Sequence, residues 1–284
     1  MTIDKIRGLI KLLRFELPFS AGVCVVMGQM LALGEFASIP VTIFGFSSVF
    51  LISASILVLN DYFDVETDKT NAPHRPIPSG LVSPNEALVS SFFLLLTGIF
   101  TSSLINVKTF IISILLAIIG FLYNRYLKKS GLPGNLLVSF SVGTTFIFGG
   151  ASVGLPFQKA VLFFGLIAAL IDLGEEIAAD AMDIKGDQLI NSNSLAIKYG
   201  RSIALKISGF IFLLVILLSS IPFLLQWFRI IYLIPIGIMD LLIIYPALKL
   251  LKSQNEEGRK FIRWIYLGAI SGIIIFIIMR FIGI

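Results

Sequence analysis

Long apolar stretches separated by short polar segments run along the whole chain. An α-helix needs about 20 apolar residues to cross a bilayer, and prolines near the ends of such stretches mark helix boundaries. No stretch has the alternating pattern of a membrane β-strand. We therefore predict an all-α polytopic membrane protein, a bundle of about nine transmembrane helices at residues 17–34, 38–60, 86–106, 108–126, 134–152, 159–179, 206–226, 230–250 and 263–282.

The composition supports this class of protein. Hydrophobic residues make up 57% of the 284 residues and charged residues 14%, whereas a soluble domain has about 25% charged residues. The net charge of +5 does not indicate nucleic-acid binding, because the basic residues are spread along the chain without a basic tract. Cys24 is the only cysteine, which excludes a disulfide framework and a thiolate metal site. We expect one transmembrane domain, residues 1–284.

The basic residues predict how this domain lies in the cell membrane. Four of them interrupt segment 1–16, which indicates an amphipathic helix on the membrane surface rather than a signal peptide. With the N-terminus in the cytoplasm, 18 of the 22 basic residues fall on the cytoplasmic side, a strong positive-inside bias. The two longest loops, 61–85 and 180–205, then lie in the cytoplasm, and the C-terminus lies outside.

The acidic residues repeat a pattern in those two loops. Each loop begins with three aspartates in the spacing D-x2-D-x3-D: the first triplet is Asp61, Asp64 and Asp68, and the second is Asp180, Asp183 and Asp187. On a continuous helix, positions i, i+3 and i+7 share one face, so each triplet would form a row of carboxylates. Asp172 and Glu176 extend the second row into the membrane, while Glu66 and Lys185 point elsewhere.

Such rows of like charge near a bilayer are costly unless a cation offsets them. A solvated helix cap would explain one acidic turn, but not two identically spaced sets at equivalent helix ends. Oxygen ligands without His or Cys favour a hard ion, so we predict Mg²⁺ at the two triplets. Two facing triplets suggest two Mg²⁺ ions that hold a diphosphate.

The residues around both triplets resemble a known family. The run from Asn60 to Asp68, followed by Arg75-Pro76-Ile77-Pro78-Ser79-Gly80, resembles the first signature of the UbiA superfamily of intramembrane prenyltransferases. The second signature is similar to Asp183-Ile184-Lys185-Gly186-Asp187 followed by Ser194-Leu195-Ala196 and Lys198-Tyr199-Gly200. The resemblance covers nearly the whole chain. It implies a helical bundle around a central cavity open to the cytoplasmic side, and a polyprenyl diphosphate donor.

The stretch from Glu176 to Asp183 resembles the archaeal branch of the family, which forms the second ether bond of archaeal membrane lipids. That branch transfers a geranylgeranyl group from geranylgeranyl diphosphate to the C2 hydroxyl of geranylgeranylglyceryl phosphate, a lipid-like phosphorylated acceptor.

The chain departs from the family pattern in two places. Where relatives have Arg-Pro before the first span, this chain has Arg14-Phe15-Glu16-Leu17-Pro18, which leaves the roles of Arg14 and Glu16 open. A Tyr-x-x-x-Lys pattern counted from Tyr123 reaches Leu127, so Lys128 or Lys129 would have to substitute.

The predicted site combines the aspartates with nearby polar and basic residues. The six triplet aspartates are the predicted metal ligands and catalytic residues, assisted by Asn60. Arg75 is expected to contact a phosphate through two guanidinium nitrogens, Lys128 to reach the diphosphate, and the ring of Tyr123 to shield an allylic cation. The other substrate-binding candidates are Lys69, Lys185, Lys198 and Glu176.

Two further titratable residues have less defined roles. His74, the only histidine, is interpreted as a solvated loop residue. Asp240 lies within a span, where a carboxylate is either functional or held by a hydrogen bond to a neighbouring helix.

Alternatives exist within the family and outside it. The acceptor could instead be an aromatic quinone precursor or a tetrapyrrole. A cation-coupled transporter could also use buried carboxylates, but its sites lie near the midplane on broken helices. A CDP-alcohol phosphotransferase would carry a D-G-x2-A-R signature, which is absent. The expected partners are the two substrates and membrane lipids, and the sequence does not indicate an oligomeric state.

Overall fold

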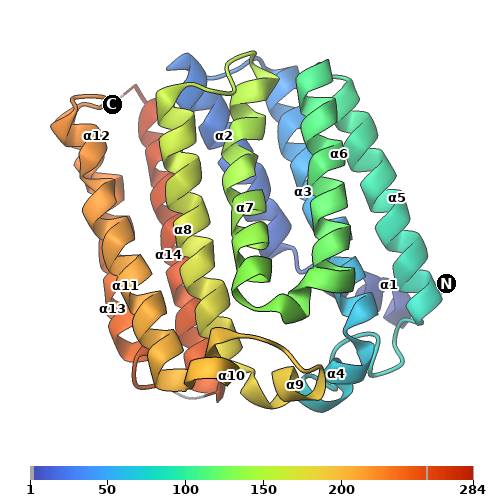
Figure 1. Cartoon of the computed structure of the whole chain (residues 1–284). Coiled ribbons are helices and arrows are strands. Elements are labelled where there is room, and N and C mark those ends of the chain that lie inside the picture. Colours follow the sequence, from blue (N-terminus) through green and yellow to red (C-terminus); the bar gives the residue numbers. More distant parts are fainter. Residues whose placement is uncertain (1–2, 254, 284) are drawn as a thin grey trace.

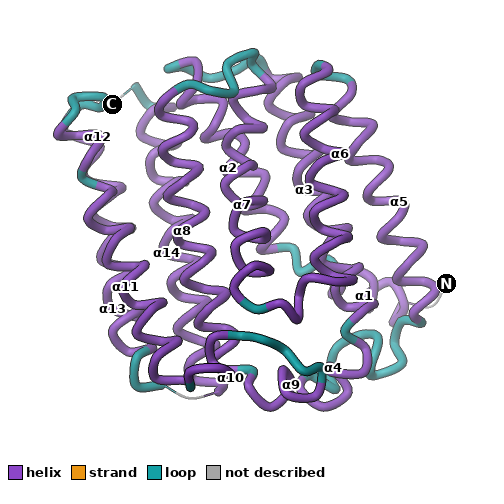
Figure 2. The backbone as a smooth tube through the Cα atoms, in the orientation of Figure 1, coloured by secondary structure: helices purple, strands orange, loops and turns teal. Residues whose placement is uncertain are grey.

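The computed structural model describes residues 3–253 and 255–283, which form helices and loops without a strand (Figures 1 and 2). Long helices run side by side across the molecule: α2 (Glu16–Leu33), α3 (Ile39–Phe63), α5 (Pro84–Ser103), α6 (Val107–Leu122), α7 (Leu132–Ser152), α8 (Lys159–Met182), α11 (Arg201–Ser219), α13 (Leu233–Leu250) and α14 (Asn255–Phe281). The all-α prediction is confirmed.

Eight of the long helices of the described chain are long and apolar enough to cross a membrane. The remaining one, α8, carries four acidic residues at positions 172, 175, 176 and 180, yet it packs inside the bundle against α7, α11 and α14. It runs parallel to its neighbours (Figure 1), and we treat it as a ninth crossing. The protein is therefore a multi-pass membrane protein.

Local sequence signals set several helix ends. Ser83 and Glu86 form a capping box at the start of α5, and Asn106 and Thr109 form one at the start of α6. Gly34 ends α2 in the left-handed conformation, with φ of 76°. Hydropathy alone placed the last helix too late: α14 begins at Asn255, because its first two turns are polar.

Close backbone contacts hold α2 against α7 in the centre of the bundle. A Cβ atom on Gly28 would lie 2.4 Å from the Phe146 carbonyl oxygen, and one on Gly149 would lie 2.3 Å from the Val25 carbonyl oxygen. Only glycine permits this approach, which is the usual way for helices to pack tightly in a bilayer.

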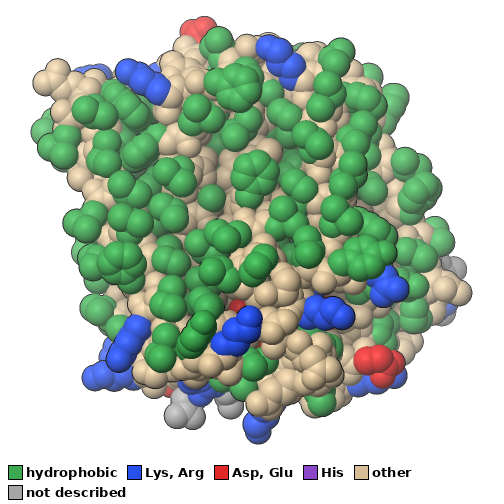
Figure 3. Space-filling model, viewed as in Figure 1, with side chains coloured by type: hydrophobic (Ala, Val, Ile, Leu, Met, Phe, Trp, Pro, Cys, Tyr) green, Lys and Arg blue, Asp and Glu red, His purple; other side chains and the backbone are tan. Residues whose placement is uncertain are grey.

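The outer faces of the bundle are apolar. Phe92, Phe93 and Phe100 of α5 and Ile111 of α6 are more than half exposed, as expected for side chains that contact lipid. Figure 3 shows hydrophobic side chains over most of one face, with Lys and Arg side chains gathered mainly near its lower end.

Short helices gather at that same end of the bundle, near α1 (Ile3–Leu12) (Figure 1). They are α4 (Val65–Asn71), α9 (Ile184–Leu189) and α10 (Leu195–Tyr199). We call this end the acidic end, because α4 and α9 contain the last aspartate of each triplet. Of the other short helices, α12 (Ile221–Leu224) lies at the opposite end, as does the C-terminal end of α14 (Figure 1).

A cavity of about 360 Å³ lies within the bundle. Its walls come from α2, α3, α6, α7, α8, α11, α13 and α14 and are mostly apolar, with Phe146, Phe164 and Phe276 among the larger lining side chains. Three acidic residues of α8 also line it: Asp172, Glu175 and Glu176. The predicted central cavity is therefore present.

Candidate active site

The two triplets do not lie on continuous helices, so the prediction of one straight row of carboxylates is wrong. Helix α3 ends at Phe63 and α8 ends at Met182, and the middle aspartate of each triplet forms the joint to the next short helix. Asp64 has φ −89° and ψ 4°, and Asp183 has φ −107° and ψ 14°. These bridge-region angles turn the chain and spread each triplet over two helices. Because α4 packs against α9, the turns bring the two loops together.

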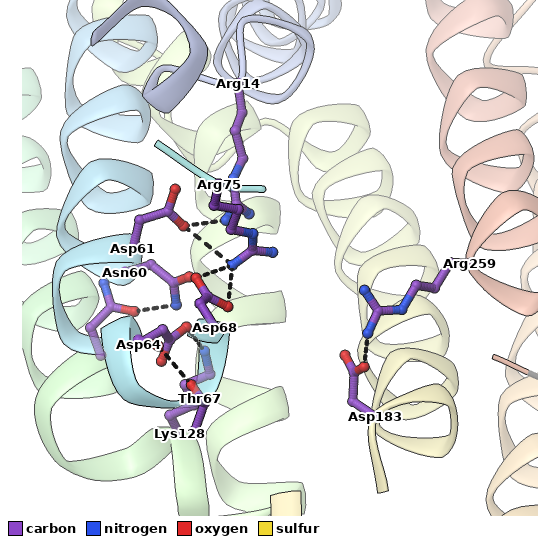
Figure 4. Close-up of polar contacts among 11 residues, drawn as sticks. Arg14, Asn60, Asp61, Asp64, Thr67, Asp68, Arg75, Lys128, Asp183 and Arg259 are labelled. Atoms are coloured by element: carbon purple, nitrogen blue, oxygen red, sulfur yellow. Dashed lines mark hydrogen bonds and ion pairs between the residues drawn. The ribbon is translucent and has the colours of Figure 1, made fainter. Parts of the chain in front are cut away.

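Each carboxylate of the first triplet contacts a basic side chain from another segment (Figure 4). Nη1 of Arg75 donates to both carboxylate oxygens of Asp68, at 2.8 and 2.6 Å, and lies 3.5 Å from Oδ1 of Asp61. Arg14 forms an ion pair with Asp61, and Lys128 forms one with Asp64. The side chains of Asp61 and Asp68 are only 3% and 7% exposed, so this cluster is largely closed off from solvent.

Arg14 has an uncommon backbone conformation, and the pKa values of Arg14 and Arg75 are both shifted in this cluster. Arg14 lies in the turn between α1 and α2 with φ of 44°, a conformation that is uncommon outside glycine and concentrates at functional sites. Burial lowers the pKa of Arg14, and the nearby Arg75 charge lowers it further. Burial also acts to lower the pKa of Arg75, but Asp61 and Asp68 outweigh it and leave that pKa above its ordinary value.

Asn60 lies inside the cluster, beside the first triplet. Its amide atoms lie 3.0 Å from Oδ2 of Asp64 and 3.1 Å from both Nζ of Lys128 and Oδ1 of Asn124. The Asn124 amide nitrogen in turn donates to the carbonyl oxygen of Ile56 at 3.1 Å. Asn60 is thus held where it can orient Asp64 and Lys128.

The second triplet is less fully paired. Asp180 accepts a hydrogen bond of 2.9 Å from Nδ2 of Asn135, and Asp183 forms an ion pair with Arg259. Oδ2 of Asp187 is buried without a hydrogen-bond partner. Burial raises the pKa of Asp187 to about 6, although a hydrogen bond from Ser194 opposes this effect. The triplet retains acceptor capacity that no side chain of the described residues satisfies.

Lys128 lies between the triplets. It is paired with Asp64 and close enough to Asp187 to lower the pKa of the Asp187 carboxyl. The charge of Asp64 raises that pKa. Figure 4 shows the first triplet on one side of the view and Asp183 with Arg259 on the other.

Further carboxylates continue from the second triplet into the cavity. Oε2 of Glu176 lies 3.5 Å from the Tyr123 hydroxyl, and Oδ2 of Asp172 accepts a 2.9 Å hydrogen bond from Ser139. Oε1 of Glu175 is buried without a partner. The apolar cavity therefore has one acidic end.

Several sequence-predicted residues lie outside this site. Lys69 contacts Glu66 at 2.7 Å on the exposed side of α4, and Lys185 and Lys198 are exposed. His74 is also exposed, in agreement with its interpretation as a solvated residue. Asp240 accepts a 2.8 Å hydrogen bond from Ser219, which links α13 to α11.

Four residues that the structure brings to the site were not predicted there. The role of Arg14 was left open and Arg259 was counted only among the basic residues of the cytoplasmic segments, whereas each pairs with a triplet aspartate. Asn135 carried no signal, and Glu175 lies beside Glu176 without belonging to the spaced row. Among the described residues, no three acidic, His or Cys side chains gather as a preformed metal cage.

Comparison with known proteins identifies the class. The model of the UbiA prenyltransferase family matches residues 21–270. The chain belongs to this family and is a membrane-embedded prenyltransferase, which confirms the resemblance and sets aside the transporter and the phosphotransferase.

Three similar proteins within this family share one name. The chain is 36% identical to digeranylgeranylglyceryl phosphate synthase of Methanococcus aeolicus, covering 89% of this chain and 90% of that protein. It is 35% identical to the synthase of Methanocaldococcus jannaschii (90% and 89%) and 31% identical to that of Saccharolobus solfataricus (96% of each).

Solved structures have the same fold. A structure described for digeranylgeranylglyceryl phosphate synthase in membranes has a TM-score of 0.73 at 32% identity, covering 98% of this chain and 99% of that one. The apo structure of a UbiA homolog from Aeropyrum pernix has a TM-score of 0.80 at 18% identity, covering 93% and 99%.

Proposed function

We propose that this protein transfers a geranylgeranyl group from geranylgeranyl diphosphate to the C2 hydroxyl of geranylgeranylglyceryl phosphate, forming the second ether bond of archaeal membrane lipids. The single structural observation that carries the proposal is an apolar cavity lined by Asp172, Glu175 and Glu176 of α8, the helix that leads to the second triplet, whose loop packs against the loop of the first triplet. An apolar chain with an anionic head fits such a site. The relatives named digeranylgeranylglyceryl phosphate synthase, which match most of the chain, support the choice of substrates.

The proposal includes Mg²⁺, with two ions shared between the triplets. A UbiA homolog from Archaeoglobus fulgidus, 19% identical with a TM-score of 0.65, was solved bound to GPP and Mg²⁺. The residues of this chain fit a hard cation, because the donors are all oxygen and Oδ2 of Asp187 is an unpaired buried acceptor. The candidate ligands are Asp61, Asp64, Asp68, Asp180, Asp183 and Asp187. Bound Mg²⁺ would neutralise the diphosphate and make it a better leaving group.

The side chains of the first triplet region hold the donor head group in this proposal. Arg75 and Lys128 already lie at the cluster, where their donors can bind phosphate oxygens. Asn60 keeps Lys128 oriented. Lys69, Lys185 and Lys198 are not needed, because they point to solvent.

The transfer breaks the bond between C1 of the geranylgeranyl group and the diphosphate oxygen, and diphosphate leaves with the electron pair. The C2 hydroxyl oxygen of the acceptor forms the new bond to C1. Its proton goes to a carboxylate of the site or to the departing diphosphate. In this proposal the ring of Tyr123, whose hydroxyl lies 3.5 Å from Oε2 of Glu176, would shield an allylic cation, and the apolar walls would exclude water that would quench it.

The proposal is tested with purified protein, labelled geranylgeranyl diphosphate, Mg²⁺ and three acceptors. These are geranylgeranylglyceryl phosphate, its dephosphorylated form and 4-hydroxybenzoate. We expect the phosphorylated lipid to be prenylated with kcat/KM about tenfold to a hundredfold above its dephosphorylated form, because an ionised phosphate contact contributes about 1.5–3 kcal/mol. Prenylation of the aromatic acid in preference to both lipids would refute the acceptor.

We also propose that the acidic end faces the cytoplasm. The positive-inside bias of the basic residues supports this orientation, and the C-terminal end of α14, at the opposite end of the bundle, would then lie outside. Single cysteines introduced at Asn71 and Ile190 should react with a membrane-impermeant reagent only after the cytoplasmic side is made accessible. Reaction from the outside of intact cells would reverse the orientation.

A further inference from the structure

Among the described residues, the pair between Arg259 and Asp183 is the one ion pair that joins α14 to the second triplet. Its geometry depends on the close approach of α14 to the end of α8. A Cβ atom on Gly258 would lie 2.1 Å from Sδ of Met182, so a larger residue there would displace the Met182 side chain. Arg259 is thus placed beside Asp183 by the packing of Gly258 against Met182 as well as by charge.

This pair is more accessible than the pairs of the first triplet. The side chains of Arg259 and Asp183 are 35% and 36% exposed, whereas Asp61 and Asp68 are almost fully buried. An ion pair that solvent can reach contributes little to stability, so a competing anion can displace Asp183 at little cost. Removing a basic partner from a buried carboxylate is far more costly.

The position of Arg259 relative to the cavity suits the head group of a lipid. Tyr266, Ala269 and Ile273, on the same helix, line the cavity. Arg259 precedes Tyr266 by seven residues, a rise of about 10 Å along a helix. A lipid whose anionic head contacts Arg259 can therefore place its chain along α14. The first triplet, with Arg75 and Lys128, lies across the site (Figure 4).

We infer that Arg259 is the binding residue for the phosphate of the acceptor, and that this phosphate replaces Asp183 as its partner. The inference rests on the proposed function, because it requires a phosphorylated acceptor. The guanidinium group can bind a phosphate through two nitrogens. The exchange frees the Asp183 carboxylate at the moment the acceptor enters, so that acceptor binding completes the second triplet.

The test compares Arg259→Gln with the wild-type protein on both forms of the acceptor. The measured quantity is the ratio of kcat/KM for geranylgeranylglyceryl phosphate to kcat/KM for its dephosphorylated form. We expect this ratio to fall about tenfold or more in Arg259→Gln and to recover in part in Arg259→Lys. A role limited to positioning Asp183 would lower both rates together and leave the ratio unchanged, which would overturn the inference.

Arg263→Gln is the matched control. Arg263 lies one turn further along α14 and pairs with Glu16 rather than with a triplet aspartate, so this variant should keep the wild-type ratio. An equal fall in the ratio in Arg263→Gln would point to the general positive charge of α14 and contradict a specific site at Arg259.

Equilibrium binding of labelled geranylgeranylglyceryl phosphate without donor gives a second readout that does not depend on turnover. Arg259→Gln should weaken binding about tenfold or more, whereas Asp183→Asn should bind as tightly as the wild type or more tightly, because it removes the competing carboxylate. Equal weakening in both variants would overturn the exchange. A wild-type protein that does not distinguish the two acceptor forms would instead refute the proposed function.

Discussion

The two acidic triplets share one spacing and one backbone turn, yet the protein neutralises them differently. In the first triplet, Arg14, Arg75 and Lys128 contact all three aspartates, two of which are almost fully buried. In the second, one aspartate has an amide partner, one has a half-exposed ion pair, and Asp187 keeps an unpaired oxygen. A repeated motif thus gives two sites of similar shape and different charge balance.

This difference suggests a division of labour within the proposed mechanism. The first triplet is held in place by its own basic side chains before any substrate arrives, which suits the binding of a diphosphate at a fixed position. The second triplet is underneutralised and reaches towards the cavity through Glu176 and Asp172. It is the side on which an incoming cation or cationic group meets the least competition.

The largest expected effect comes from removing the middle aspartate of either triplet. Asp64→Ala and Asp183→Ala should each lower kcat by about a hundredfold to a thousandfold or more, because each removes charge stabilisation from one half of the site. Turnover is measured with purified protein, with and without EDTA, and EDTA should abolish the activity of the wild-type protein. Full activity in either variant, or indifference to EDTA, would contradict a site built from both triplets.

The next largest expected effect is a loss of protein stability, and it differs between the two triplets. Arg75→Ala leaves Asp61 and Asp68 without one buried partner, and breaking a buried pair costs about 3–5 kcal/mol. Arg259→Gln breaks a half-exposed pair, which should cost about 1 kcal/mol or less. Thermal unfolding in one detergent should therefore show a clear loss for Arg75→Ala and a small one for Arg259→Gln. Arg75→Lys is the control that keeps the charge. Equal losses of stability in Arg75→Ala and Arg259→Gln would contradict the difference between the buried pair of the first triplet and the half-exposed pair of the second.

The sequence predicted the helices well and the pairing of the site poorly. Apolar stretches decide which segments cross the membrane, so the first transmembrane helix, predicted at 17–34, was found at Glu16–Leu33. The start of α14 was missed because polar turns outside the membrane carry no hydropathy signal. The family resemblance rested on local motifs, and it was confirmed.

Contacts between distant segments could not be predicted in the same way. Arg14 is 47 residues from Asp61 in the chain, and Arg259 is 76 residues from Asp183. No local pattern links such residues, and the positive-inside rule explains their charge without reference to a partner. The helix breaks at Asp64 and Asp183 were missed for a related reason. The aspartates keep a helical spacing along the sequence on both sides of each break, although the backbone leaves the helix there.

The smallest expected effect tests whether an acidic residue matters by its place or by its charge alone. Glu66 lies in the first loop between Asp64 and Asp68, but its side chain is 83% exposed and pairs with Lys69 on the outer side of α4. Glu66→Ala should therefore change kcat/KM less than about twofold and stability by less than about 1 kcal/mol, since an exposed pair contributes little. The assay is the one used for Asp64→Ala, so the two variants form a matched pair two residues apart. A loss in Glu66→Ala comparable to that in Asp64→Ala would mean that the loop acts through its total negative charge, and the contrast between the two triplets would lose its structural basis.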